Sequence, residues 1–260
     1  MKTARKAIHL LRQFTRAEPE LGVSELARRL GMDRAGVHRL LRALLEERFV
    51  EQDPGTRLYR LGLGVLDVAA VRISQHGLLT IAPPHLERLR DAVGETVALL
   101  VADGQEAVCL AVVESRQAVR VGYDIGERMP LHASAGGQAL LAHFAEADRR
   151  AVYAAGLARY TPRTLTDPEA LEAHLARIRQ DGAGSAEDSY YEGIVSAAAP
   201  VMDPKQRLAG AVSIAAPMPR RDAKDLPALA AAARRTADAI AADWAGLASG
   251  AQRLATKPGP

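Results

Sequence analysis

Residues 24–42 decide the fold of the first part of this chain. They read Ser24-Glu25-Leu26-Ala27-Arg28-Arg29-Leu30-Gly31-Met32-Asp33-Arg34-Ala35-Gly36-Val37-His38-Arg39-Leu40-Leu41-Arg42. We expect Ser24 to cap a short helix that ends at Gly31, where a left-handed residue costs little, and Asp33 to cap a second helix that runs to about Glu47. Two helices joined by a tight glycine turn are typical of helix-turn-helix modules that bind DNA.

The second of these helices has two contrasting faces. Val37, Leu40, Leu41 and Leu44 recur at the spacing of one face, which is expected to pack on the rest of the module. The opposite face is basic, and a helix in the major groove reads base edges from its N-terminal residues. A solvated arginine-rich surface is the alternative interpretation. The predicted DNA contacts of the two helices are Ser24, Arg34, Ala35, His38 and Arg39, with Arg42 reaching a phosphate.

A further helix is expected before this pair. The apolar residues of the first fourteen positions recur at helical spacing, and the pattern stops before Glu18-Pro19-Glu20. The recurring residues are Ala4, Ile8, Leu11 and Phe14, with Ala7 and Leu10 beside them.

A β-hairpin is expected after the pair. Residues 49–51 and 57–61 alternate in polarity around the turn Asp53-Pro54-Gly55-Thr56, which is a hairpin signal. A hairpin beside a helix-turn-helix is a wing. Arg57 and Arg60 lie on or beside it, so we expect both to contact the sugar-phosphate backbone.

Charge is distributed unevenly along the chain. The whole sequence holds 34 Lys+Arg and 31 Asp+Glu, a formal net charge of +3. Residues 1–62 hold 13 of the basic and 8 of the acidic side chains, a balance of +5, so the remainder has a balance of −2. Neutralising phosphates supplies most sequence-independent affinity for nucleic acid, so the cationic segment indicates double-stranded DNA as a partner. A solvated charged face would explain the charge alone equally well.

Length and composition set further limits. At 260 residues, with 48% apolar and 25% charged side chains, the chain has the composition of folded protein and the length of two domains. No apolar run approaches the ~20 residues that span a bilayer, so we expect a cytoplasmic protein with no membrane partner. One cysteine, Cys109, and histidines without paired helical spacing predict no metal site, and no cofactor is expected.

Residues 63–77 are expected to form a linker helix, because no glycine-serine stretch separates the two parts of the chain. Its leucines and valines offer a seam for a homodimer, or for a dimer of dimers. Helix-turn-helix proteins gain specificity by binding two half-sites as symmetric dimers. Pro83-Pro84 is expected to interrupt the chain before another helix around residues 85–93.

Beyond Gly94 the pattern changes to paired apolar runs with tight turns, which predicts an antiparallel sheet. The fold class is therefore α+β: an N-terminal winged helix-turn-helix, a linker helix and a second α+β domain. Predicted strands are residues 97–101, 107–113, 118–121, 194–201 and 208–214, and predicted helices are 136–144, 146–155, 168–180 and 223–247. Predicted domain boundaries are 1–62, 63–77 and 78–250, with a flexible tail at 251–260.

These motifs resemble those of the IclR-type bacterial transcriptional regulators. The resemblance implies a DNA-binding regulator whose second domain, of GAF-like or profilin-like topology, binds a small effector, often an organic or aromatic acid. Ala35-Gly36 departs from the family, which usually has two hydroxyl-bearing residues there, and this affects the operator preference. The matching segments, in the family's order over about residues 4–245, are 24–31, 37–41, 53–62, 94–97, 126–136, 160–167 and 197–201.

The second domain has two features that suit such an effector. Residues 130–137 run small side chains into a helix start, where backbone N–H groups and the helix dipole can hold a carboxylate. Ser196 and Ser213 lie in apolar strands, where a hydroxyl is either satisfied locally or directed at a ligand. The resemblance places Ala135, Gly136, Ser196 and Ser213 in the pocket, whereas Met129 and Leu131 are either pocket wall or ordinary core.

Other interpretations stay open. Tyr190 and Tyr191 either reshape the pocket or lie on the surface. Arg128 either neutralises an acidic effector or pairs with an acidic side chain to hold its turn. The alternative function is a hydrolase that uses His132 and Ser134 with a nearby aspartate, although the chain has no GxSxG motif. A purely architectural DNA-binding protein would leave about two thirds of the chain without a role.

Overall fold

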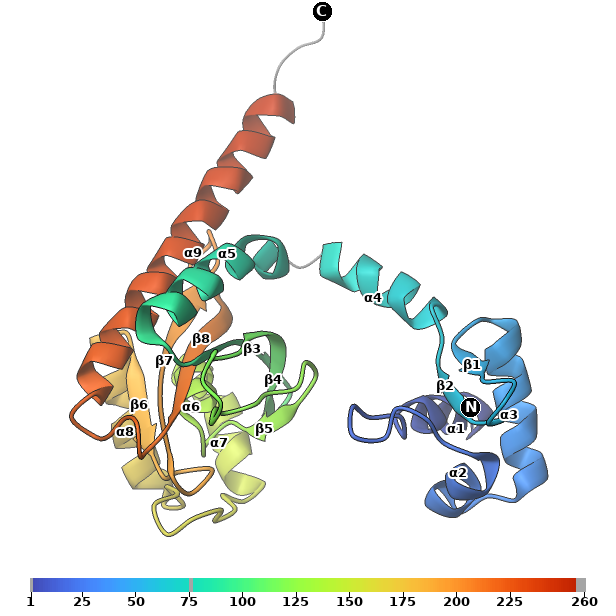
Figure 1. Cartoon of the computed structure of the whole chain (residues 1–260). Coiled ribbons are helices and arrows are strands. Elements are labelled where there is room, and N and C mark those ends of the chain that lie inside the picture. The colour runs from blue at the N-terminus through green and yellow to red at the C-terminus, as the bar shows by residue number, and fades with distance from the viewer. Residues whose placement is uncertain (1, 75–76, 256–260) are drawn as a thin grey trace, which may run out of the picture. The chain divides into compact units, whose positions relative to one another are not determined.

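The computed structural model describes residues 2–74 and 77–255, and the chain divides into two compact units, residues 1–76 and 77–260 (Figure 1). Each unit has its own hydrophobic core. The first is a helical module with a small hairpin, and the second contains an antiparallel sheet with helices. The predicted α+β class is confirmed.

The first unit packs its helices around leucine side chains. Leu10, Leu26 and Leu41 are completely buried in its core. Burying one such side chain stabilises a fold by roughly 1.5–3 kcal/mol, so these contacts hold the module together. Its described elements are α1 (Lys2–Leu11), α2 (Val23–Leu30), α3 (Arg34–Glu46), β1 (Val50–Gln52), β2 (Tyr59–Leu61) and α4 (Gly64–Ser74).

The buried face of α1 differs from the predicted one. Leu10 and Phe14 are buried, but Ile8 is 53% exposed and Ala4 is also exposed. The helix ends at Leu11, so Phe14 enters the core from the following turn and does not mark a helical face. The prediction was wrong because it extended the helical period past the end of the helix.

Gly31 and Asp33 form the turn between α2 and α3 as predicted. Gly31 has φ of 60°, in the left-handed region, and its N–H donates back to the end of α2. The Asp33 carboxylate accepts a hydrogen bond from the N–H of Gly36, which caps α3. The orientation of α3 relative to α2 therefore depends on a glycine and an aspartate that are both evident in the sequence.

The predicted cap of α2 is wrong. The helix begins at Val23 with Gly22 as its N-cap, and Ser24 lies exposed in the first turn. Leu21, just before it, exchanges two backbone hydrogen bonds of 2.9 Å with Tyr59. This long-range bridge fixes where the chain enters the helix, which a local capping pattern does not reveal.

The wing is confirmed. β1 and β2 pair antiparallel, with Glu51 opposite Arg60. At the tip, the Asp53 carboxylate accepts hydrogen bonds from the N–H groups of Thr56 and Gly55, at 2.6 and 3.0 Å, and these bonds lower the pKa of Asp53. Arg57 follows with φ of 63°, a conformation that costs a non-glycine residue about 1–3 kcal/mol.

Gly62 lies where the wing returns to the module. Its N–H donates to the carbonyl of Phe49 at 2.9 Å. A Cβ at this position would lie 2.4 Å from the carbonyl oxygen of Arg48. The close approach of two backbone segments therefore requires glycine here.

The second unit contains a six-stranded antiparallel sheet in the order β5-β4-β3-β8-β7-β6. Its strands are β3 (Thr96–Asp103), β4 (Glu106–Val113), β5 (Arg128–Pro130), β6 (Gly184–Glu187), β7 (Ile194–Met202) and β8 (Leu208–Pro217). The edge strands β5 and β6 were not predicted, because they have only three and four residues.

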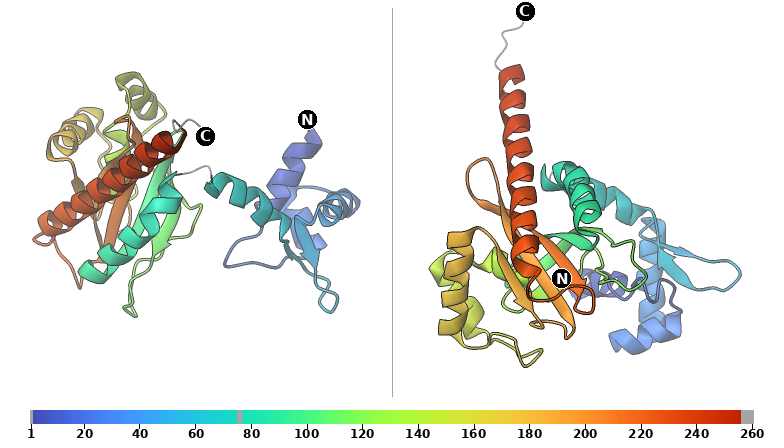
Figure 2. Two further views of the ribbon diagram at one scale, coloured as in Figure 1. Left: turned by 90° about the horizontal axis from the view of Figure 1, so that it is seen from above. Right: turned by 60° about the vertical axis from the view of Figure 1, so that its left-hand side comes forward.

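Helices cover both faces of this sheet (Figures 1 and 2). α5 (Gly77–Val93) and α9 (Leu226–Ala255) pack side by side on one face. α6 (Ala135–Leu141) packs on the other, with α8 (Pro168–Asp181) against α6 and β6, and α7 (Glu146–Ala154) on the same side.

Residues 118–121 are a loop, so the predicted strand there is wrong. Val121 is buried, and its carbonyl accepts a hydrogen bond of 2.7 Å from the Thr96 hydroxyl. A side chain thus satisfies the backbone group that a neighbouring strand would otherwise have paired.

α5 runs without a break through Pro83 and Pro84, so the predicted interruption is also wrong. A proline inside a helix costs roughly 3 kcal/mol. Leu78, Leu86 and Leu89 of the same helix are buried against the sheet and α9. Since each buried leucine contributes roughly 1.5–3 kcal/mol, tertiary packing offsets the local cost.

The two faces of the sheet carry side chains of different size. Valine, leucine and isoleucine on β3 and β8 point toward α5 and α9, whereas the alternate residues toward α6 are mostly small. The backbone of α6 can therefore approach the sheet closely. The small residues of this face are Ala98, Ala198, Ala211, Ser213 and Ala215.

The termini of the predicted segments fall partly outside the description. α9 continues to Ala255, while residues 256–260 of the expected tail and residues 75–76 of the expected linker lie outside the described residues.

In the described part of the chain no single helix is long and apolar enough to cross a membrane, although α4 and α5 together meet that test by length and composition alone.

Replacing Gly62 with alanine is expected to destabilise the first unit by about 1–3 kcal/mol, because the new Cβ must displace the Arg48 carbonyl. Amide hydrogen exchange over residues 10–61 of the full chain measures this, and faster exchange is the expected result. Gly55→Ala at the exposed wing tip is the control, since its Cβ would meet its nearest atom, on Asp53, at 3.4 Å. Equal exchange rates in the two variants would contradict the explanation.

Candidate functional site

Five of the predicted DNA contacts lie on the exposed side of α3. The buried side of this helix carries Val37, Leu40 and Leu41, with Leu44 partly buried, as predicted. Positions 38, 39 and 42 lie three, four and seven residues after position 35, which is the spacing of one helical face. The exposed residues are Arg34, Ala35, His38, Arg39 and Arg42.

The arginines of this unit differ in how far they are neutralised. Arg42 pairs with Glu46 at 3.3 Å, and Arg60 pairs with carboxylates of Glu51 at 3.3 Å and Glu20 at 3.7 Å. Arg34, Arg39 and Arg57 form no ion pair with any residue in the described ranges 2–74 and 77–255. An exposed guanidinium without an acidic partner keeps its charge for a phosphate or a base edge.

Two arginines on α2 are engaged within the protein. Glu25 accepts hydrogen bonds from Arg28 at 2.9 Å and from Arg29 at 2.5 Å, and Arg29 also donates to Glu18 at 2.6 Å. The bonds from Arg28 and then Arg29 lower the pKa of Glu25 to about 2. The carboxylate is therefore charged at neutral pH, and α2 presents less free positive charge than its sequence suggests.

The structure gives a reason for glycine at position 36. A Cβ there would lie 2.9 Å from the Asp33 carboxylate oxygen that caps α3. Glycine at position 36 therefore leaves room for the Asp33 carboxylate to cap the helix. The neighbouring Ala35 is exposed. Neither side chain at positions 35 and 36 can donate a hydrogen bond to a phosphate.

The predicted effector contacts fall into two groups. Gly136 and Ser213 lie against each other: a Cβ at position 136 would be 3.4 Å from the Ser213 hydroxyl oxygen. Ser196 lies on the same face of the sheet, on the adjacent strand β7, opposite Ala215. Met129 is on β5, three strands from β8, which at about 4.8 Å per strand is roughly 14 Å away.

Three of the predicted effector contacts are buried in the core. Met129 is 1% exposed, and Leu131 and Ala135 are completely buried. Leu131 lies under the start of α6, where a Cβ on Gly137 would come within 2.7 Å of its carbonyl oxygen. Ser134 caps α6 by accepting a hydrogen bond of 3.1 Å from the N–H of Gly137.

Tyr123 is a neighbour of this site that the sequence analysis did not name. It is 8% exposed and lies in the core beside the Ser213 side chain. Burial, followed by the charge of Glu127, raises the pKa of Tyr123, so the phenol stays protonated. Tyr123 comes two residues after Val121, and the incorrect strand prediction there removed the signal that would have placed it in the core.

The structure shows where Tyr190 and Tyr191 lie and which side chains Arg128 contacts. Tyr190 is partly buried against the core, with its ring 4.3 Å from that of Tyr191, which is 48% exposed. Arg128 donates to Asp103 and, at 2.7 Å, to Glu106, so it holds the turn between β3 and β4.

His132 and Ser134 do not form a catalytic pair. The Nε2 atom of His132 lies 2.9 Å from the carbonyl oxygen of Ala158, and the Ser134 hydroxyl caps α6. Burial raises the pKa of the Cys109 thiol to about 12, so a thiolate is disfavoured at neutral pH. Among the described residues, no group of three His, Cys, Asp or Glu side chains could hold a metal ion.

Two family descriptions match this chain. The description "Bacterial transcriptional regulator IclR C-terminal" matches residues 70–242, and "IclR helix-turn-helix domain" matches residues 3–54. Both families are regulators and not enzymes, which gives no support to the hydrolase alternative.

Individual proteins are similar over most of their length. The HTH-type transcriptional repressor AllR of Salmonella typhi is 32% identical over 216 residues, which cover 83% of this chain and 79% of AllR. The crystal structure of an IclR homolog from Microbacterium hydrocarbonoxydans, complexed with 4-hydroxybenzoate, is 27% identical with a TM-score of 0.82 and covers 93% of this chain and 98% of that one. The IclR structure from Thermotoga maritima, 24% identical with a TM-score of 0.79, shares the fold over 94% of this chain and 99% of its own.

Proposed function

Because this chain belongs to the IclR family of bacterial transcriptional regulators, we propose that α3 binds the major groove of a DNA operator and that a small organic acid in the second unit controls this binding. The observation that carries the proposal is the exposed face of α3. Its Arg34, His38 and Arg39 side chains have no ion-pair partner among the described residues. Base edges of the major groove accept hydrogen bonds from such side chains. The AllR relatives are repressors, which supports repression here, and a chromosomal operator supports a cytoplasmic location.

The proposed contacts divide by role. Arg34, Ala35, His38 and Arg39 face bases, because they lie at the N-terminal end of α3. Arg42, Ser24 and the wing arginines Arg57 and Arg60 face phosphates and sugars. The left-handed backbone of Arg57 supports this assignment, since strain at an exposed turn is commonly retained for function.

The proposed effector pocket lies between α6 and the small-residue face of the sheet. Gly136, Ser213 and Ser196 form it, with Ala135 at the helix start and Met129 and Leu131 as the more distant core beneath it. A carboxylate or phenol of an effector would accept a hydrogen bond from the Ser213 hydroxyl, beside the buried Tyr123. The 4-hydroxybenzoate bound to the Microbacterium homolog supports an aromatic acid as the class of effector.

We propose that α4 forms the seam of a homodimer. Leu66 and Ile73 of α4 and Leu63 just before it are 62, 49 and 55% exposed. Together with Ala70 they are separated by alternate steps of three and four residues. This is the a/d pattern of a helix that pairs with a second copy. Two copies would present two recognition helices to half-sites one helical turn apart.

Arg39→Ala and His38→Ala are expected to weaken binding to a DNA site selected with the wild-type chain by about 1–3 kcal/mol, about 5- to 150-fold. Fluorescence anisotropy with selected and scrambled duplexes measures this. Arg57→Ala is the matched control, because losing a phosphate contact should weaken both duplexes alike and reduce the salt slope by about one. Unchanged preference for the selected duplex in both α3 variants would remove α3 as the reading element.

Leu66→Glu is expected to convert the dimer to a monomer, because the substitution places a charge in the proposed seam. Sedimentation velocity on the full chain gives the mass. Ile8→Glu is the control, since Ile8 is an equally exposed apolar residue on α1. A dimer that survives Leu66→Glu would place the subunit interface elsewhere.

Ser213→Leu is expected to abolish the response of DNA binding to aromatic carboxylates, because leucine removes the proposed ligand hydroxyl and is larger than the side chain that contacts Gly136. Operator affinity without ligand should stay within about twofold of the wild type, since Ser213 is in the second unit. Thermal shift with a panel that includes 4-hydroxybenzoate identifies a ligand, which raises the melting temperature by mass action. A variant that still responds would refute the pocket.

A further inference from the structure

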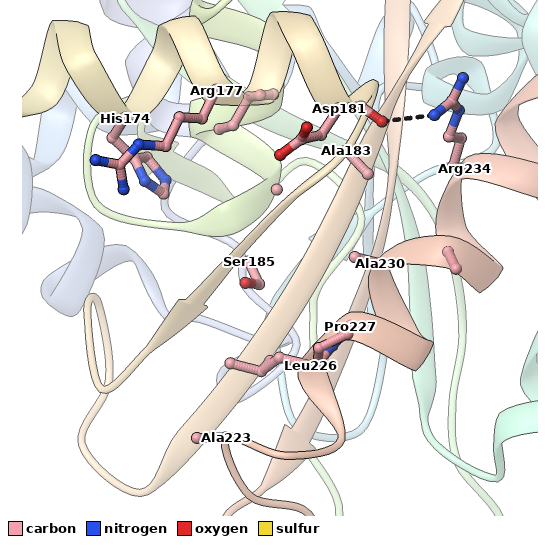
Figure 3. A pocket seen from close by; sticks show the side chains of 13 residues that line it. His174, Arg177, Asp181, Ala183, Ser185, Ala223, Leu226, Pro227, Ala230 and Arg234 are labelled. Carbon is pink, nitrogen blue, oxygen red and sulfur yellow. Dashed lines mark hydrogen bonds between the residues drawn. The ribbon is translucent and has the colours of Figure 1, made fainter.

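A groove beside the edge strand β6 has the size and lining of a small-molecule site (Figure 3). It lies between α8 and the first turns of α9 and has a volume of about 550 Å³. Small-molecule sites are typically clefts of about 300–1,000 Å³ with mainly apolar walls and a few polar groups. None of the residues of the proposed effector pocket line this groove.

One wall of the groove is apolar. Leu226, Pro227 and Ala230 project from the start of α9, and Ala183 lies across from them (Figure 3). Ile178 of α8, which is 1% exposed, closes the groove at the side of the core. Such a wall suits the hydrocarbon part of a ligand, because contact there removes apolar surface from water.

The two arginines that line the groove differ in their ion pairs. Arg177 on α8 is exposed and forms no ion pair with a described residue, in contrast to Arg179 on the same helix, which pairs with Glu172 at 3.0 Å. Arg234 donates to the backbone carbonyl of Asp181 at 2.7 Å. Arg234 also pairs with the Asp238 carboxylate at 3.9 Å, so of the two guanidinium groups only that of Arg177 has no carboxylate partner among the described residues.

His174 adds no positive charge to the groove. Burial, and then the nearby charge of Arg177, lower the pKa of His174, so the imidazole is neutral at pH 7. Its Nε2 atom lies 3.1 Å from the Gln138 side-chain oxygen, to which it donates. Arg177 is thus the cationic side chain of the groove that no carboxylate of the described residues neutralises.

We propose that this groove is a second ligand site, which binds an organic monocarboxylate through Arg177 and packs the hydrocarbon part of that ligand on Leu226, Pro227 and Ala230. A guanidinium forms two parallel hydrogen bonds with one carboxylate, which gives the site its orientation. The proposal is independent of the DNA-binding function and of the pocket at Ser213.

The site is connected to the proposed effector pocket by hydrogen bonds. His174 lines the groove and bonds to Gln138 of α6, and Gln138 donates to the carbonyl of His132 at 2.8 Å. Gly136, two residues before Gln138, touches Ser213. A ligand that contacts His174 therefore acts on the helix that forms one wall of the effector pocket, so the two ligands would change each other's affinity by the same factor.

The test is isothermal titration of the full chain with octanoate, with octylamine and octanol as probes of the same hydrocarbon length. Octanoate is expected to bind and the other two to bind at least tenfold more weakly. Arg177→Glu should weaken octanoate at least tenfold, about 1.4 kcal/mol. Arg235→Glu is the matched control, because it makes the same change of charge on exposed α9 outside the groove and should have no effect.

Ala230→Phe fills the groove without changing its charge and is expected to abolish octanoate binding, and Ala230→Leu replaces it if the phenylalanine variant does not fold. Ser213→Leu should leave octanoate binding intact. The proposal is overturned if millimolar octanoate does not bind, if octylamine binds equally well, or if Arg177→Glu and a folded Ala230 variant both bind as the wild type does. Loss of octanoate binding in Ser213→Leu alone would assign the ligand to the effector pocket and would also overturn it.

Discussion

The close approach of α6 to the small-residue face of the sheet is the constraint on which the second unit depends. Gly136 leaves no room for a Cβ between the helix and Leu100, since that atom would lie 2.2 Å from the leucine side chain. The backbone of α6 is thereby held against Ser213, and Gln138 further along the helix fixes both the preceding loop and α8 through His132 and His174. The proposed effector site at Ser213 and the groove lined by His174 are therefore joined through α6.

The first unit depends on a different device, the separation of charge between its helices. α2 neutralises its arginines with Glu18 and Glu25, whereas α3 leaves Arg34 and Arg39 without acidic partners. Exposed ion pairs contribute little to stability, so this difference has little effect on folding. Its effect is on binding, because α3, unlike α2, presents arginines that no acidic side chain of the described residues neutralises, on the face opposite its buried leucines.

Regulation in this family requires that an effector favour one arrangement of the protein over another by its differential affinity. In the proposed effector site, a ligand bound at Ser213 would lie beside Tyr123, whose loop spans residues 114–127. That loop also contains Val121, tied to β3 through Thr96. A ligand there would therefore contact a segment that is anchored at the edge of the core.

The sequence by itself determined the features that depend on near neighbours: the Gly31 turn, the Asp33 cap, the buried face of α3, the hairpin around Asp53 and the family. These follow from residues a few positions apart, whose spacing and backbone preferences are legible without a partner. Only the tertiary structure decided that α5 continues through Pro83-Pro84, that Leu21 sets the start of α2, that Tyr123 is buried beside Ser213, and that Arg177 has no ion-pair partner among the described residues. Each of these rests on contacts between residues distant in the chain, whose burial and hydrogen bonds outweigh local preference by a few kcal/mol or supply a partner that no local pattern encodes.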